Sequence, residues 1–281
     1  MRTTVLILAF APAALAAQTP VADSAVTAFL KTARTATARY REQSAATADG
    51  YHAVGPDFPS MGEHWVSFPL VARGELDPAH PQVLEYIKVE GRPVLAGVAW
   101  ALPAGEGQQP PDFPPIANAW HYHSGTVDDE SFVASHVGAT HHAPVGPALA
   151  VLHAWLWIDN PDGTFATDNW ALPWARLGLA PAGDASADAA RLLSLATGGE
   201  RYFALLLRVV ARPDSLEDER ARAVLEQARH AVLLAVDSLR IRPGDGPALA
   251  AHWARRWQDV WQDLRAALGP DARSRMDQLG R

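Results

Sequence analysis

The stretch "WHYHSG", residues 120–125, places two imidazole side chains two residues apart between bulky aromatic residues. Side chains two apart on an extended strand point to the same face. If this stretch is extended, His121 and His123 therefore present both rings to one point. Neutral imidazole is the commonest metal ligand in proteins and suits Zn, Cu and Fe.

Histidine is unevenly distributed along the chain. Six of the eleven histidines lie between residues 121 and 153, and His64 lies upstream in "MGEHWV". The six are His121, His123, His136, His141, His142 and His153. The chain has no cysteine, so a metal site must use His, Asp, Glu or backbone ligands. We predict a divalent transition metal (Zn, Cu or Fe) bound by His64, His121, His123 and His153. Whether His136, His141 and His142 join them is left open, and we interpret His52, His80, His230 and His252 as unrelated to the site.

Two alternatives to a metal site remain open. Seven of the ten tryptophans lie between residues 65 and 174, and on an extended strand His153, Trp155 and Trp157 would share one face. In the first alternative the chain is a binding module without metal, in which indole rings hold a sugar or an aromatic ligand. In the second it is a structural envelope protein with incidental histidines. Trp253, Trp257 and Trp261 have helical spacing and are expected in a core.

Several kinds of chemistry have no motif here. Without cysteine there is no thiol nucleophile, and no Gly-rich phosphate loop is present. Ser124 lacks the strand–turn–helix context of a nucleophile elbow. Residues 128–130 (Asp-Asp-Glu) are typical of a solvated turn rather than of a catalytic pair. The sequence therefore indicates a place for chemistry and leaves open whether the protein is an enzyme.

The elements that must position these histidines are mainly short strands. Residues 83–89 and 93–102 predict an antiparallel hairpin about Glu90-Gly91-Arg92. Residues 62–69 and 151–158 predict two more strands, and after the turn residues 160–163 the segment "GTFATDNW" predicts a returning strand. Residues 22–49 have helical spacing, and residues 103–118 form a proline-rich loop.

The last hundred residues are predicted to be helical. One apolar stripe runs from Val224 to Leu239, and a second runs from Leu249 to Leu268. Gly198-Gly199 ends one helical stretch, Ser215 with Asp218 resembles a capping box, and Gly246-Pro247 begins the next helix. We predict an α+β fold: a small, mainly antiparallel sheet with an N-terminal helix over 17–180, followed by an α-helical C-terminal domain over 181–281.

The first sixteen residues are typical of a signal peptide. A short positive start precedes the apolar run "VLILAFAPAALA", and Ala14-Leu15-Ala16 matches a signal-peptidase site. We expect cleavage after Ala16 and a periplasmic or extracellular protein, with no integral membrane segment after cleavage. The net charge is −7 and no Lys/Arg-rich patch occurs, so nucleic acid is not an expected partner. The expected partners are a metal ion and a small ligand.

Four segments resemble, in order, a family of exported or envelope-associated bacterial proteins of unknown function. They are "TARYREQSAATADGY", "MGEHWV", "GELDPAHPQVLEYIKVEGRPVLAGVAW" and "LHAWLWIDNPDGTFATDNW", between about residues 30 and 179. The Met-Gly-x-His and Leu-His-x-Trp motifs, the latter followed by Asn-Pro-x-Gly-x-Phe, imply that His64 and His153 are site residues. The family usually has an acidic residue where this chain has Ala99, and often a histidine near Leu149. The resemblance therefore implies that this chain uses other ligands in their place.

Overall fold

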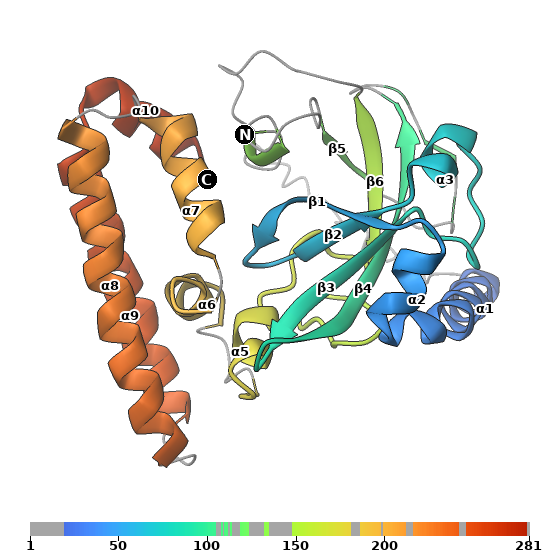
Figure 1. Ribbon diagram of the computed structural model, residues 1–281, viewed down its shortest axis with the longest axis horizontal. Helices are drawn as coiled ribbons and strands as arrows, with labels where there is room; N and C mark the ends of the chain where they lie inside the picture. The colour runs from blue at the N-terminus through green and yellow to red at the C-terminus, as the bar shows by residue number, and fades with distance from the viewer. Residues whose placement is uncertain are drawn as a thin grey trace, which may run out of the picture.

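The computed structural model describes residues 20–104, 108, 110–111, 113, 119–123, 132–134, 148–180, 186–197, 199–211, 216–241 and 246–279. The predicted signal peptide, residues 128–130, Ser215, and three of the clustered histidines (His136, His141 and His142) lie outside this part of the chain. The fold is α+β, as predicted (Figure 1). None of the described helices is long and apolar enough to cross a membrane.

A six-stranded antiparallel sheet forms the centre of the structure. In spatial order its strands are β1 (His52–Phe58), β2 (Gly62–Val66), β3 (Val83–Val89), β4 (Arg92–Pro103), β6 (Leu149–Ala154) and β5 (His121–His123). The predicted hairpin is confirmed as β3–β4. Its two-residue turn, Glu90-Gly91, has positive φ angles of 51° and 77° at both positions, which suits the twist of a tight hairpin.

The N-terminal helices cover one face of this sheet. They are α1 (Pro20–Thr37), the 3-10 turn η1 (Ala38–Arg41), α2 (Gln43–Ala48) and, after β2, α3 (Phe68–Arg73). Phe29 and Tyr40 pack against Leu84, Trp100 and Leu152 in a shared core. The helix predicted over 22–49 is therefore confirmed in place but broken into three pieces.

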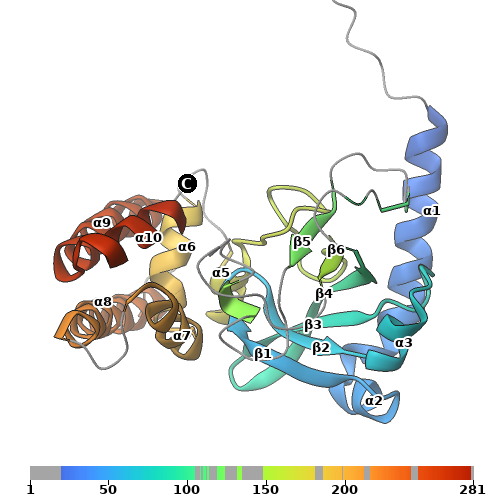
Figure 2. The ribbon, with the colours of Figure 1, turned by 90° about the horizontal axis from the view of Figure 1, so that it is seen from above.

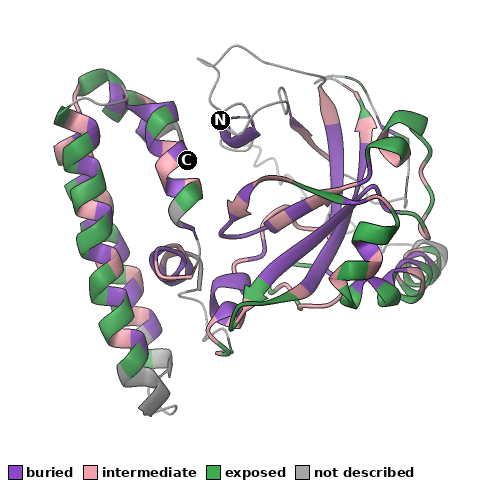
Figure 3. Ribbon diagram, in the orientation of Figure 1, coloured by how far each residue is buried: buried purple, intermediate pink, exposed green. Residues whose placement is uncertain are grey.

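The C-terminal helices lie on the other side of the sheet (Figure 2). They are α5 (Leu172–Arg176), α6 (Ser186–Ser194), α7 (Glu200–Val210), α8 (Leu216–Ile241), α9 (Gly246–Ala267) and α10 (Pro270–Leu279). The buried stripes of α8 and α9 face inward and their exposed faces point outward (Figure 3). The predicted break near Gly199 is confirmed, because α6 ends at Ser194 and Gly199 is the N-cap of α7, and the predicted helix start is confirmed, because α9 begins at Gly246. One core of buried side chains runs from Phe58 on β1 to Met276 on α10.

One predicted strand is absent, two predicted strand ends are wrong, and one strand was not predicted. The segment 163–170 forms turns rather than a returning strand, because its hydrogen bonds are made with Trp155. The backbone N–H of Trp155 donates to the carbonyl of Thr164, and the indole Nε1 of Trp155 donates to the carbonyl of Ala166. β6 ends at Ala154, after which Trp157 and Ile158 both donate to the carbonyl of Ala96. β2 ends at Val66 because Ser67-Phe68-Pro69 begins α3, and β1 is a strand that the sequence did not predict.

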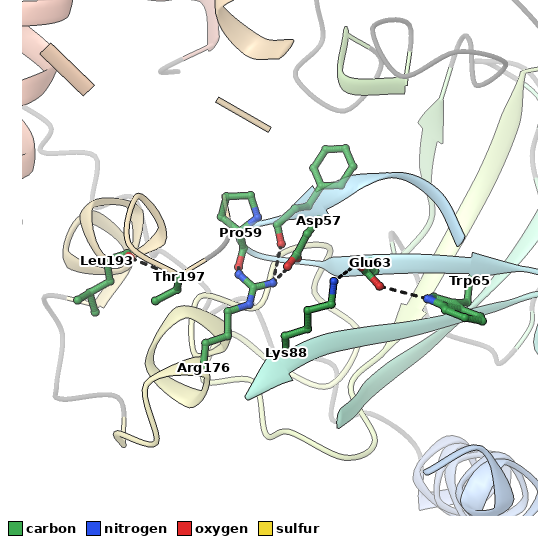
Figure 4. A network of polar contacts seen from close by, with 9 residues as sticks. Asp57, Pro59, Glu63, Trp65, Lys88, Arg176, Leu193 and Thr197 are labelled. Carbon is green, nitrogen blue, oxygen red and sulfur yellow. Dashed lines mark hydrogen bonds and ion pairs between the residues drawn. The ribbon is translucent and has the colours of Figure 1, made fainter. Parts of the chain in front are cut away.

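A buried arginine fastens α5 to the end of β1 (Figure 4). The Arg176 side chain is 1% exposed and pairs with Asp57 at 2.5 Å. Its guanidinium also donates to the carbonyls of Phe58 and Pro59 at 3.1 and 3.2 Å. Alongside it, Lys88 on β3 bonds to Glu63 on β2 at 2.8 Å. These bonds hold the β1–β2 turn in place and so fix the strand that carries His64.

Candidate metal centre

The register of the sheet places the histidines on one face. His64 on β2 is opposite Glu85 on β3, and Glu85 is opposite Gly97 on β4. On the same face His153 on β6 lies opposite Ala99. At the far edge His121 and His123 on β5 pair with Val151 and Leu149 of β6, two and four residues before His153. Because side chains alternate along a strand, all these residues point away from the N-terminal helices.

His64, Glu85 and His153 form a group that could hold a metal ion. One potential ligand atom from each lies within 4.8 Å of the others. The three residues are 5%, 0% and 1% exposed. A buried carboxylate beside two imidazoles is an arrangement that water does not stabilise, so a cation or a proton must balance its charge.

Ordinary hydrogen bonds do not account for the polar atoms of this group. Glu85 Oε1 and His153 Nδ1 are in close contact, yet the contact lacks hydrogen-bond geometry. Both oxygens of Glu85 and both ring nitrogens of His153 are without an ordinary hydrogen bond. Buried polar atoms are hydrogen-bonded in the great majority of cases, and exceptions mark redox, catalytic or ion-binding positions. One such atom from each of these two residues, together with one ring nitrogen of His64, lies where the ligands of a shared metal ion would be.

Gly97 makes room for the Glu85 carboxylate. A Cβ at position 97 would lie 2.5 Å from Glu85 Oε2 and 2.8 Å from Trp155 Cε3. The sheet therefore lacks a side chain where the carboxylate lies. Ala99, the next residue on this face of β4, is fully buried and small. The acidic side chain on this face comes instead from Glu85 on the neighbouring strand.

The second histidine pair adjoins this group. The ring of His121 stacks on that of His153, with centroids 4.9 Å apart and an interplanar angle of 18°. His121 Nε2 and His123 Nε2 lie 2.8 Å apart. His123 is 4% exposed, whereas His121 is half-buried and lies 3.5 Å from the hydroxyl of Thr167 through Nδ1. The stretch "HYH" is extended as β5, which meets the condition stated from the sequence, and the Nε2 atoms of His121 and His123 converge.

Aromatic rings line the outer side of the centre. Phe58 and Phe132 each contact the His64 ring edge-on at 5.5 Å, and Trp155 stacks on His153 at 5.8 Å. Such an apolar shell keeps water out and strengthens charge interactions within it. Trp155 is 3% exposed and bonded to Ala166, and Trp157 lies beneath Arg34 at 4.7 Å. The tryptophan alternative requires indole faces that are open to a ligand beside the histidines. Neither Trp155 nor Trp157 presents such a face.

The sequence prediction identified two members of the buried group and missed the third. His64 and His153 come together, while the sequence analysis does not single out Glu85 within "VLEYIKV". Its signal was a lone acidic residue between apolar neighbours in the middle of a strand. The four histidines excluded from the site, His52, His80, His230 and His252, are all exposed.

Comparison with known proteins identified no relatives of this chain. No protein family, no curated protein and no solved structure matches the chain.

Proposed function

We propose that this chain binds a divalent transition metal ion, Zn, Cu or Fe, through His64, Glu85 and His153. The observation that supports this most is the buried Glu85 carboxylate, enclosed with two imidazoles and without ordinary hydrogen bonds. Two histidines and one carboxylate are the ligands of catalytic zinc sites and of non-haem iron sites, both of which keep an open position. We extend the proposal to His121 and His123 as further ligands, because the ring of His121 stacks on that of His153 and the two Nε2 atoms of His121 and His123 lie together.

Export is part of the same proposal. Residues 1–16 have the composition of a signal peptide, and the resemblance to exported bacterial proteins agrees with it. A metal centre made without cysteine suits an oxidising space such as the periplasm, where thiolates are oxidised. N-terminal sequencing of the protein recovered from the periplasm or medium tests this, with Ala17 expected as the first residue.

Titration calorimetry on metal-free protein tests the centre. We expect about one equivalent of Zn²⁺ or Cu²⁺ to bind at neutral pH, and affinity to fall at lower pH because each imidazole must be neutral to coordinate. Glu85→Gln, which keeps the shape of the side chain, should weaken binding by about tenfold or more, as should His64→Ala. His230→Ala and His252→Ala are matched controls, because both histidines are exposed on helices away from the sheet.

The same titration decides the role of β5. If His121 and His123 are ligands, His121→Ala and His123→Ala each weaken binding as strongly as His64→Ala. If they only enclose the centre, the effect of each is small. Wild-type protein that takes up no metal at neutral pH after chelator treatment contradicts the proposal.

A further inference from the structure

A second feature of the molecule lies between the sheet and the C-terminal helices. It is a cavity of about 500 Å³ that is lined from both sides. Phe58, Thr167 and Trp170 contribute from the sheet side, and Tyr202, Trp257 and Trp261 from α7 and α9. Cavities that hold small molecules have volumes of about 300–1,000 Å³. The space is therefore large enough for a ligand and larger than a packing defect.

The lining of this cavity is rich in aromatic rings. Trp257 and Trp261, one helical turn apart on α9, have ring centroids 6.1 Å apart. Tyr202 packs on Phe58 at 5.2 Å, which joins the helical wall to the sheet wall. Trp170 and Trp261 are half-buried, so part of each indole is accessible to a molecule in the cavity. Flat apolar faces at this spacing favour a ring-bearing ligand.

The charged groups of the cavity are already positioned and carry an excess of negative charge. Asp188 bonds to Arg191 at 2.8 Å and accepts from Gln258, while Asp168 accepts from Ser60. Arg191 also lies over the Trp170 ring at 4.8 Å. Two carboxylates against one guanidinium leave the lining with a net negative charge, which disfavours an anionic ligand.

The Tyr202 hydroxyl adds a hydrogen-bond donor to this wall. Burial, and then the charge of Asp168, raise the pKa of Tyr202 above its usual range. The phenol therefore keeps its proton at neutral pH. A ligand with an acceptor atom or a cationic group finds a partner at this end of the cavity.

We propose that the cavity between the sheet and the C-terminal helices binds a small, flat aromatic molecule that is neutral or cationic. The aromatic walls hold the ring, and Asp168 and Asp188 determine the sign of the charge. The site is distinct from the metal centre, and the binding does not require a metal. The spacing of the α9 tryptophans predicts only core packing. The proposed site gives Trp257 and Trp261 the additional role of binding a ligand.

Two fluorescent probes with the same ring frame test this proposal on the metal-free full-length chain. N-phenyl-1-naphthylamine is neutral, and 8-anilinonaphthalene-1-sulfonate is its sulfonated, anionic counterpart. We expect the neutral probe to bind saturably, and the anionic probe to bind about tenfold more weakly. Asp168→Asn should narrow this difference, because it removes one of the two negative charges.

Variants of the lining locate the binding. Trp261→Leu removes one wall, and Leu206→Trp fills the cavity from α7. Each should weaken binding of the neutral probe by about tenfold. Trp157→Leu is the matched control, since this half-buried indole lies outside the cavity beneath Arg34, and its effect should stay within about twofold. Non-saturable binding, equal loss in Trp157→Leu, or an anionic probe that binds as tightly as the neutral one would each overturn the proposal.

Discussion

Gly97 leaves free the space beside the Glu85 carboxylate. An added methyl group would lie 2.5 Å from Glu85 Oε2, in a region that is fully buried. We predict that Gly97→Ala lowers the free energy of unfolding by about 1–3 kcal/mol, the usual cost of overpacking a core. It should also weaken metal binding by about tenfold, because the carboxylate is displaced. Chemical denaturation and calorimetry measure the two effects.

A double variant separates the contact with Glu85 from a general defect. Glu85→Asp shortens the acid by one methylene and reopens the space that the added methyl group takes. The double variant Gly97→Ala/Glu85→Asp should therefore be more stable than the sum of the single changes predicts. Strict additivity would mean that the methyl group is accommodated elsewhere, against Trp155, and that Gly97 does not serve the carboxylate.

At the scale of residues, some members of the candidate ligand set could be predicted from the sequence and one could not. His64 and His153 were predictable because imidazole is the commonest metal ligand and so identifies a candidate site from residue type alone. Glu85 was not, because its role depends on the β2–β3 and β3–β4 registers that place it opposite His64 and Gly97. Register comes from pairing between distant segments, and a one-residue slip would turn the carboxylate to the other face.

Among the elements, the pair between β1 and α5 is expected to make stability depend on pH. Burial raises the pKa of Asp57 to about 6, although the charge of Arg176 acts to lower it. A carboxyl whose folded pKa is raised contributes stability below its unfolded pKa, near 4, and loses it as pH rises through about 6. We predict that the stability advantage of wild type over Asp57→Asn shrinks between pH 4 and pH 6 and is constant above.

Urea denaturation at half-unit pH steps measures this difference. Lys88→Met is a second test, because the charge of Lys88 acts to lower the pKa of Asp57, so its removal should move the upper end of this interval to higher pH. A stability advantage of wild type over Asp57→Asn that grows between pH 4 and pH 6 would contradict the prediction. The ion pair with Arg176 would then outweigh the cost of burying the carboxylate.

The α9 stripe should affect stability without affecting the centre. Trp253 is 2% exposed and packs on Trp174 of α5, with ring centroids 5.8 Å apart. We predict that Trp253→Ala lowers the free energy of unfolding by about 3–5 kcal/mol. The metal stoichiometry of the folded fraction should be unchanged, as measured by metal analysis after gel filtration. Loss of metal with stability intact would mean that the helices hold the centre together.

Elements with their own local signals were predictable, and those defined by tertiary contacts were not. The β3–β4 hairpin has a two-residue turn with glycine, and α9 has a long apolar stripe. Both features can be recognised within one short stretch of the sequence. The segment 163–170 has strand-like composition, but its partners are the backbone and indole of Trp155 rather than a neighbouring strand. β1 contains glycine and proline and is held by pairing with β2, so its own composition argued against a strand.

Over the whole molecule, the cavity and the metal centre share a wall. Thr167 lines the cavity and its hydroxyl lies 3.5 Å from His121 Nδ1. Phe58 lines the cavity as well, and its ring contacts that of His64. A ligand that packs against Thr167 and Phe58 holds the neighbouring rings of His121 and His64 in one arrangement, so binding at one site favours binding at the other, and the reverse holds equally.

We predict positive coupling between the two sites. Saturating N-phenyl-1-naphthylamine should raise Zn²⁺ affinity by about fivefold, and saturating Zn²⁺ should raise probe affinity by the same factor, because coupling free energies are reciprocal. Thr167→Ala should lower the coupling by a larger factor than it weakens probe binding to the metal-free protein. Calorimetry with and without the probe measures both arms. Equal Zn²⁺ affinities in the presence and absence of bound probe would show that the shared wall is rigid and that the two sites act independently.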